Sequence, residues 1–309
     1  MKRTFLLFSF LALFLPHLAA AHPGWGLVVD PHGTVYFTDL ERVWKIDAEG
    51  RVSVFVEDVH THALYLDEAG VLYGEHHGYE PATDTFHDRY WKATPEGRVT
   101  DITLEEAARF FDRWDEQGNQ FRLFNDKEKA VVTRTTPEGD SVLIAGGPFG
   151  HVDGCGAQAR FRLFGTSAWG PDQSIYVTNG GLLRRVTRHG TVTTLIGPEQ
   201  GFPHSVQDNG RPRYSALLGL AVAADGTVYF ADIDQRKVFK RAPDGAIATV
   251  LDGGMLWTPS GVTLAGDDLY VLEYRRDFAS PTNRIGKTGP RVRKIAPDGF
   301  VTVVGVADG

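Results

Sequence analysis

The chain has 309 residues, a formal net charge of −7 and a single cysteine. Its 32 Lys and Arg residues form no basic cluster, which argues against nucleic acid and anionic membranes as partners. Because Cys155 alone cannot form an internal disulfide, the fold must depend on packing, and we expect this thiol to be buried.

The first 21 residues have the composition of a secretory signal peptide. Lys2 and Arg3 precede an apolar run over residues 5–15, and three alanines follow at 19–21. The apolar run is too short for a membrane anchor. We therefore expect an exported protein, secreted or periplasmic, whose mature chain is one domain over residues 22–309.

A short glycine turn recurs along the mature chain and sets its repeat. In the first unit, β-type runs at 27–30, 34–39, 42–47 and 51–56 are joined by short turns, which gives four strands per unit. Equivalent turns are 42 to 55 residues apart, a period typical of propeller blades. They lie at Gly50, Gly97, Gly139, Gly190, Gly245 and Gly299. The sequence therefore predicts an all-β fold, a six-bladed β-propeller of four-stranded antiparallel blades.

The strands of the other blades follow in chain order. We expect them at 63–66, 71–75, 90–93 and 98–100 in blade 2; at 120–125, 130–136 and 141–145 in blade 3; at 166–169, 174–178, 183–187 and 191–196 in blade 4; at 220–223, 227–231, 237–241 and 246–251 in blade 5; and within 262–304 in blade 6. Blades 1 and 6 are each expected to consist of four strands that follow one another in the chain. We therefore predict that the ring closes by packing of two complete blades, without a shared strand.

The start of blade 3 has two interpretations. Thr103 and Glu106 form a capping-box pattern that predicts an amphipathic helix as far as Trp114. The turn at 115–118 resembles the first turn of other blades, however, and favours an inner strand over 110–114 that follows a short helix.

The connections predict two unequal faces. Turns between first and second strands, and between third and fourth, are tight hairpins such as 224–226. Long connections, including 78–89 and 275–290, share the opposite face and are expected to carry any site. Their aromatic and basic residues could wall a cleft beside the ring closure, although the two loops could equally be unrelated. The expected ligand-binding residues are Tyr79, Phe86, Tyr274, Arg275 and Arg276, with His87 and Phe278 facing the same cleft.

Two stretches of the chain resemble NHL repeats. The first is residues 146–161 with the strands at 174–179 and 183–187, and the second is residues 219–232 with 238–241. The resemblance implies a six-bladed propeller. It leaves the function open, because this architecture hosts binding modules, lactonases and lyases.

Two enzymatic propeller groups can be compared with the chain residue by residue. Propellers similar to gluconolactonases hold a metal with Glu, Asn and Asp where the innermost strands begin, and this chain has none of these residues there. The positions are Gly24-Trp25, His62, Phe110, Gly165-Thr166, Leu218-Gly219 and Pro259-Ser260. Peptide-amidating lyases use histidines as zinc ligands near the channel, and His62 resembles one of them.

Histidines and one carboxylate gather in blade 2. The cluster comprises His60, His62, Glu75, His76, His77 and His87. Imidazoles with a carboxylate suit zinc, and calcium is the alternative divalent metal. Since His76 and His77 are consecutive, they point to opposite sides of a strand. The candidate metal ligands are therefore His62, Glu75, His77 and His87, with hydrogen-bonded loop histidines as the alternative.

Two further patterns have structural and functional interpretations. A polar residue closes the second strand of every blade: Asp39, Glu75, Asn125, Asn179, Asp232 and Glu273. Such residues bond the following turn in any repeat, so only the longer Glu75 and Glu273 are kept as candidates. Cleavage after residue 21 would also expose His22, whose amine and imidazole could chelate copper.

The face that carries the long connections is called the long-loop face. The favoured hypothesis is an exported monomer that binds a small-molecule, saccharide or protein ligand across this face. The alternative is a metal-dependent hydrolase, similar to a lactonase, or a lyase, with its site on blade 2.

Overall fold

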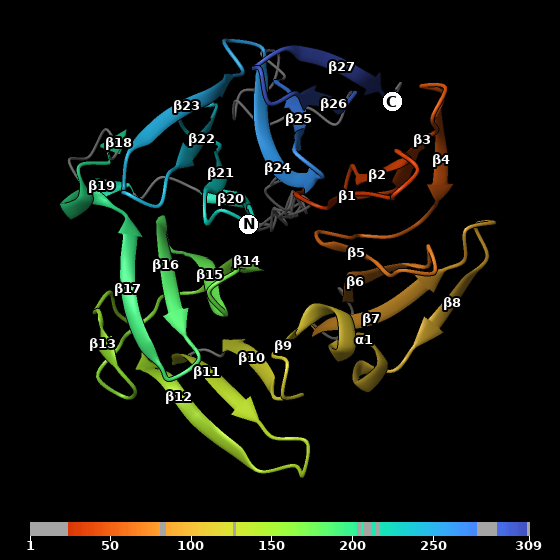
Figure 1. The fold of residues 1–309 in the computed structure, drawn as a ribbon. Helices are drawn as coiled ribbons and strands as arrows, with labels where there is room; N and C mark the ends of the chain where they lie inside the picture. Colours follow the sequence, from red (N-terminus) through yellow and green to blue (C-terminus); the bar gives the residue numbers. More distant parts are fainter. Residues whose placement is uncertain are drawn as a thin grey trace, which may run out of the picture.

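The computed structural model describes residues 24–80, 85–125, 128–202, 205–206, 212–213, 217–276 and 289–307. Six antiparallel sheets surround a central channel and confirm the six-bladed β-propeller (Figure 1). The expected signal peptide, His22 and Phe278 lie outside the described residues. Within these ranges, no helix has the length and apolar character needed to cross a membrane.

The strands run from the channel outward in each blade. Blade 1 contains β1 (Leu27–Val29), β2 (Val35–Thr38), β3 (Val43–Ile46) and β4 (Val52–Val56); blade 2 contains β5 (Leu64–Leu66), β6 (Leu72–Glu80), β7 (Thr85–Ala93) and β8 (Val99–Ile102); blade 3 contains β9 (Arg113–Trp114), β10 (Gln120–Asn125), β11 (Lys129–Thr135) and β12 (Ser141–Pro148). Blade 4 contains β14 (Phe164–Trp169), β15 (Ser174–Asn179), β16 (Leu182–Thr187) and β17 (Thr191–Ile196); blade 5 contains β20 (Leu217–Val222), β21 (Val228–Asp232), β22 (Lys237–Arg241) and β23 (Ile247–Asp252); blade 6 contains β24 (Trp257–Ala265), β25 (Asp268–Arg275), β26 (Arg291–Ile295) and β27 (Val301–Val306).

The crossings between blades contain the remaining elements. They are α1 (Leu104–Phe111) before blade 3, β13 (Gly154–Cys155) before blade 4, and η1 (Pro198–Gln200), β18 (Ser205–Val206) and β19 (Pro212–Arg213) before blade 5. β13 pairs with β17 and adds a fifth strand to the outer edge of blade 4.

The ring closes between two complete blades, as predicted. Side chains of blades 1 and 6 share one apolar cluster that includes Phe37 and Leu272. Ser260 Oγ donates a hydrogen bond to the carbonyl of Gly24 at 2.6 Å, and Tyr274 Oη donates to the carbonyl of Thr38 at 2.5 Å. The closure therefore depends on side-chain packing and hydrogen bonds between the two sheets.

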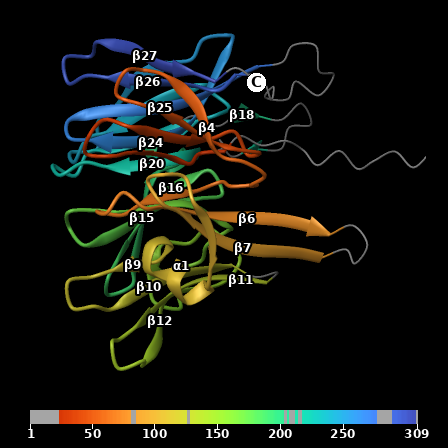
Figure 2. The same ribbon diagram turned by 90° about the vertical axis from the view of Figure 1, so that its right-hand side faces the viewer.

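The two faces of the propeller differ as the connections predicted. One face carries tight turns closed by main-chain hydrogen bonds, such as those from Gly50 N–H to Asp47 and from Gly245 N–H to Ala242. In the side view, the β6–β7 hairpin projects from the opposite face (Figure 2).

Blade 3 combines both interpretations of its first segment. Thr103 Oγ1 accepts a hydrogen bond from Glu106 N–H at 3.1 Å, and the Glu106 side chain accepts one from Thr103 N–H, so the capping box starts α1 as expected. The inner strand that follows is only Arg113–Trp114 and pairs with Gln120 and Phe121 of β10. The helix thus replaces most of the inner strand of this blade.

The junction between blades 2 and 3 is packed differently from the other five junctions. Among the described residues, apolar clusters join blades 1 and 2, 3 and 4, 4 and 5, 5 and 6, and 6 and 1. No such cluster joins blades 2 and 3, where α1 lies between β7 and β9 (Figure 1). Phe110 of this helix stacks on Tyr73 at 3.7 Å and contacts Tyr65 at 5.1 Å between ring centroids.

Candidate functional site

A cavity of about 450 Å³ lies in the central channel. Its walls include the first residues of inner strands and the polar ends of second strands, which places it toward the face with the long connections. The aromatic lining residues are Trp25, Tyr65, Phe110, Phe111 and Phe164, and the polar ones are Glu75, Asp112, Arg113, Asn125, Thr166, Ser167 and Thr263. Pockets of this size with a few polar groups among aromatic rings typically bind small molecules.

The short inner strand of blade 3 explains why the cavity exists on this side of the channel. β9 covers only the first two residues of β10, so Leu123 and Asn125 at its other end contribute to the cavity wall. The C-terminal residues of α1, Phe110 and Phe111, form the adjoining wall. Replacing a full strand by a helix that packs toward blade 2 therefore opens the centre of the ring.

The backbone around Glu75 is firmly held. Its carbonyl accepts hydrogen bonds from Thr61 Oγ1 at 2.5 Å and from the Trp91 indole at 3.3 Å. Trp91 itself is fully buried in the core between blades 1 and 2. Glu75 therefore contributes to the cavity wall from a rigid strand.

Two other polar side chains of the lining form hydrogen bonds with backbone groups of the next blade. Asn125 Oδ1 accepts a hydrogen bond from Phe164 N–H at 3.1 Å and so links blades 3 and 4. Thr166 Oγ1 donates to the carbonyl of Leu218 at 2.6 Å and links blades 4 and 5. These bonds fix the shape of the wall.

Arg113 is a cation in the cavity wall whose hydrogen-bond acceptors, within the described residues, are all backbone carbonyls. Its Nη1 donates to the carbonyls of Phe111 at 3.2 Å and Asp112 at 3.4 Å, and its Nη2 donates to the carbonyl of Ser167 at 2.6 Å. Its Nε is buried and makes no hydrogen bond in the described part of the chain. Burial lowers the pKa of this guanidinium, against the smaller opposing effect of Asp112.

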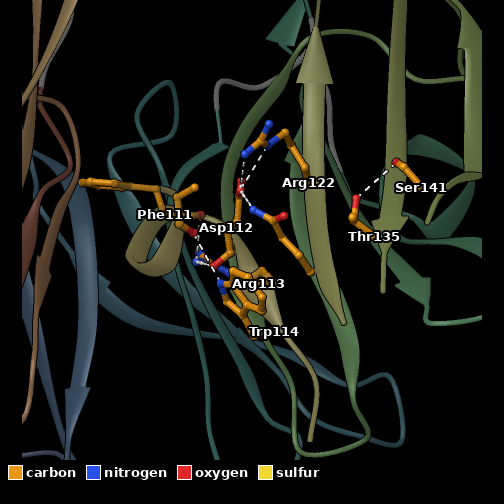
Figure 3. Close-up of polar contacts among 9 residues, drawn as sticks. Phe111, Asp112, Arg113, Trp114, Arg122, Thr135 and Ser141 are labelled. Atoms are coloured by element: carbon orange, nitrogen blue, oxygen red, sulfur yellow. Dashed lines mark hydrogen bonds and ion pairs between the residues drawn. The ribbon is translucent and has the colours of Figure 1, made fainter. Parts of the chain in front are cut away.

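The neighbouring carboxylate of Asp112 is already engaged elsewhere. Its Oδ2 accepts from Gln120 Nε2 at 2.6 Å and from the Nε and Nη2 of Arg122, both at 3.0 Å. In the close-up this carboxylate points toward Arg122 and away from the guanidinium of Arg113 (Figure 3). Asp112 and Arg122 thus form their own ion pair beside the cavity.

The described histidines of blade 2, His60, His62 and His76, are not part of the cavity lining. His62 is 8% exposed and its ring stacks on Trp25, with 5.0 Å between centroids. His60 meets His62 edge-on at 4.8 Å, and His60 N–H donates to Nδ1 of His76 at 2.9 Å. His62 therefore supports an aromatic lining residue and is not itself part of the lining.

The remaining candidates of blade 2 lie on the β6–β7 hairpin. His77 pairs with Asp88, Tyr79 with Phe86, and Gly78 with His87. Since neighbouring positions of a strand alternate between faces, the backbone register puts His77 and His87 at positions on opposite faces of the hairpin. The side chains of His77, Tyr79, Phe86 and His87 lie outside the described part of the structure.

The blade 6 candidates occupy different environments. Tyr274 is 3% exposed, burial raises the pKa of its phenol, and its hydroxyl holds the ring closure, so it does not face a cleft as we expected. Arg275 is exposed at the end of β25. Arg276 is partly buried, and its N–H donates to the carbonyl of Leu256 at 2.8 Å.

Glu273 belongs to a buried ion cluster outside the cavity lining. Its carboxylate is fully buried and accepts from Arg293 Nε and Nη2, both at 2.6 Å, and from Arg291 Nε at 2.8 Å. The guanidinium of Arg291 lies 3.8 Å above the ring of Trp257. This cluster fixes β25 to β26, so Glu273 has a structural role.

The polar residues at the ends of the other second strands mainly form hydrogen bonds with backbone groups. Asp39 accepts from Glu41 and Arg42 N–H groups, and Asp232 accepts from Asp234 and Gln235 N–H groups. Of the six closing positions, only Glu75 and Asn125 contribute to the cavity lining.

Cys155 does not fit the expectation of a buried thiol. It lies on β13 at the outer edge of blade 4 and is exposed, with Sγ 3.4 Å from Thr191 Oγ1. The prediction was wrong because Cys155 lies on the extra strand β13, at the solvent-exposed outer edge of blade 4.

The cavity residues do not form a ligand set suited to a divalent metal. Asp112 is bound by Arg122 and Gln120, and the side-chain oxygen of Asn125 accepts a backbone N–H, so neither side chain is directed to share a cation with Glu75. Across the described ranges, no group of three His, Cys, Asp or Glu residues has metal-binding geometry. The chemistry that the cavity walls can offer is therefore hydrogen bonding, ion pairing and apolar contact.

No protein-family model matches the sequence, and curated protein sequences give no match. Solved structures share the fold. A luciferin-regenerating enzyme is 13% identical and covers 94% of this chain and 95% of its own, with a TM-score of 0.57. A gluconolactonase from Xanthomonas campestris is 15% identical, covers 82% and 84%, and has a TM-score of 0.51. Regucalcin from Agrobacterium tumefaciens, described as a calcium-binding protein, is 14% identical, covers 85% and 86%, and has a TM-score of 0.50. Likeness at this identity supports the propeller architecture alone.

The sequence alone does not single out Arg113 or the aromatic lining. In the sequence, Trp25 and Phe110 are noted only because they occupy positions where gluconolactonase-like propellers have metal-binding Glu, Asn or Asp residues. The capping box at Thr103 is the sequence signal that could have indicated the cavity. A helix at this point shortens the inner strand of blade 3 and leaves space beside the channel.

Proposed function

We propose that this protein is an exported propeller that binds a small organic molecule in the channel cavity. The observation that carries the proposal is the cavity of about 450 Å³, lined by aromatic rings and a few polar side chains at the centre of a rigid ring. The long-loop face, with Arg275 exposed beside it, would form the approach to this cavity.

The lining suits a cyclic, polyhydroxylated ligand such as a saccharide. Trp25 and Phe164 supply flat apolar surfaces, on which the C–H faces of a sugar ring can pack. Glu75 and Thr263 supply hydrogen-bonding groups that could fix the orientation of hydroxyl groups. A few polar groups among apolar walls give specificity while most of the contact area remains apolar.

Filling the cavity is expected to abolish ligand binding without unfolding the protein. Ala63 lines the cavity and is partly exposed, so the ring of an Ala63→Phe variant would occupy the ligand space. We expect binding of glucose, maltose or glucuronate, measured by calorimetry, to weaken at least about tenfold, since each 1.4 kcal/mol of lost contact is a tenfold change. Circular dichroism should show an intact fold.

The matched control is Ala224→Phe. Ala224 is exposed in the tight turn between Ala223 and Gly226, on the opposite face. Its replacement should leave binding unchanged. Equal binding by wild type and the Ala63→Phe variant would show that the ligand site is elsewhere.

The second candidate is a metal-dependent hydrolase or lyase. It is favoured by the fold shared with a gluconolactonase and with a calcium-binding regucalcin. We expect that dialysis of the purified protein against EDTA leaves its Tm unchanged, because the described residues do not assemble a ligand set. Stoichiometric zinc or calcium that is lost in His62→Ala or Glu75→Gln variants would instead establish a metal site and favour the metalloenzyme.

A further inference from the structure

We infer that the cavity ligand is an organic acid whose carboxylate pairs with Arg113. This inference rests on the proposed binding function and narrows the ligand class. It follows from the unusual charge balance of the cavity wall.

Three buried or nearly buried arginines of the ring are each balanced by a carboxylate. Arg293 holds the carboxylate of Glu273 through Nε and Nη2, both at 2.6 Å. Arg184, which is fully buried, donates to Asp153 at 2.5 Å. Each of these guanidinium groups therefore has a carboxylate partner within its own blade or the preceding crossing, as does Arg291 with Glu273.

Arg113 lacks this compensation. Among the described residues it forms no ion pair, and the adjacent carboxylate of Asp112 is committed to Arg122. Carbonyl oxygens of Phe111, Asp112 and Ser167 satisfy part of its donor capacity. Two of them lie at the C-terminal end of α1, where the partial negative charge of the helix offsets only part of a full positive charge.

The guanidinium of Arg113 keeps donor capacity for a carboxylate at its Nη groups. A guanidinium has four N–H donors on its two Nη atoms, and these make three hydrogen bonds, to the carbonyls of Phe111, Asp112 and Ser167. At least one Nη–H is therefore available to a ligand, whereas Nε is buried out of its reach. Because Arg113 lines the cavity, a carboxylate bound there would accept this Nη–H and balance the charge.

The other charged lining groups define the rest of the ligand. Glu75 also lines the cavity, and its negative charge disfavours a second anion beside it, whereas a hydroxyl group carries no such penalty. Asp112 is neutralised by Arg122 and contributes no net charge. The class that fits is therefore a hydroxylated acid with an apolar face, such as a sugar acid.

The test compares a carboxylic acid with its neutral amide on the intact protein. Glucuronate and glucuronamide have the same ring and hydroxyl groups, and phenylacetate and phenylacetamide form a second pair with an aromatic body. By calorimetry at low ionic strength, we expect each acid to bind about tenfold more tightly than its amide, because a charge-assisted hydrogen bond is stronger than a neutral one.

Variants at Arg113 separate a binding role from a structural one. In the Arg113→Gln variant, which keeps side-chain donors for the helix carbonyls, the preference for the acid should fall to within about twofold. The Arg113→Lys variant should keep part of the preference, because the charge remains but a single ammonium group replaces the two Nη groups that bond the carbonyls and the ligand. The comparison of acid and amide on wild type stays informative even if either variant unfolds.

The failures of the two proposals are distinguishable. If the amides bind as tightly as the acids and the Ala63→Phe variant abolishes this binding, the cavity binds ligands but the acid inference is wrong. If the acids bind more tightly and the preference persists in the Arg113→Gln variant, another residue holds the carboxylate and the inference is also wrong. If binding is unaffected by the Ala63→Phe variant, both proposals fail.

Discussion

The Gly190→Ala variant is expected to lose about 2–5 kcal/mol of unfolding free energy, combining left-handed backbone strain with overpacking. Gly190 ends the β16–β17 turn with φ +83°, and an added Cβ would lie 1.8 Å from the carbonyl oxygen of Ile144 in blade 3. Because that oxygen belongs to backbone in the core between blades 3 and 4, the clash can be relieved only by moving a strand. Urea denaturation would measure the loss.

Gly139 provides a matched control for this variant. It occupies the equivalent turn of blade 3, with φ +95° and a hydrogen bond from its N–H to Thr136, but an added Cβ would meet nothing within 4 Å. The Gly139→Ala variant should therefore lose only the strain component, about 1–2 kcal/mol. Equal losses for the two variants would show that the junction between blades 3 and 4 yields easily.

A loss of about 3–5 kcal/mol is also expected for the Glu273→Gln variant, because removal of one partner leaves buried charges uncompensated. The carboxylate is fully buried between Arg291 and Arg293, which are 17% and 15% exposed. A neutral amide cannot balance two guanidinium groups and donates an N–H where both arginines require an acceptor. Equilibrium denaturation with an unchanged m-value would show that the effect is on stability.

Lys294→Gln, on the neighbouring strand β26, is the control. Lys294 pairs with Asp268 at 2.9 Å, but both side chains are substantially solvent-accessible, so the loss should be much smaller. A Glu273→Gln variant as stable as the Lys294→Gln variant would indicate that the arginines reach solvent without cost. Because the cluster lies outside the cavity lining, ligand affinity at temperatures below unfolding should be unchanged in both variants.

The fold was predictable because each blade is a local pattern. Strand runs separated by glycine turns repeat at a nearly constant period, and the turns fix which strands pair. Both the blade number and the closure by two complete blades followed from this pattern. Even the helix of blade 3 was indicated by Thr103 and Glu106, since a capping box depends only on residues three positions apart.

The site could not be predicted in the same way because its chemistry depends on contacts between distant segments. Asp112 precedes Arg113 in the sequence, yet its carboxylate binds Arg122 on the adjacent strand. In the sequence, Glu273 and Tyr274 stand at the end of a strand, where exposed side chains are expected. The pairing of β25 with β26 buries Glu273, and the packing of blade 6 on blade 1 buries Tyr274. The proposed cleft residues of the β6–β7 hairpin, in contrast, remain predictions.

The helix in place of an inner strand has a consequence for how this protein can diversify. In the other blades, most residues of the channel wall belong to hydrogen-bonded ladders, so a substitution there risks disturbing a sheet. Here one wall is formed by the end of α1, whose eight residues make no ladder bonds with any blade. Mutations in this short segment can therefore alter the shape of the chamber while the surrounding sheets keep their pairing, so new ligand preferences can evolve at little cost to the ring.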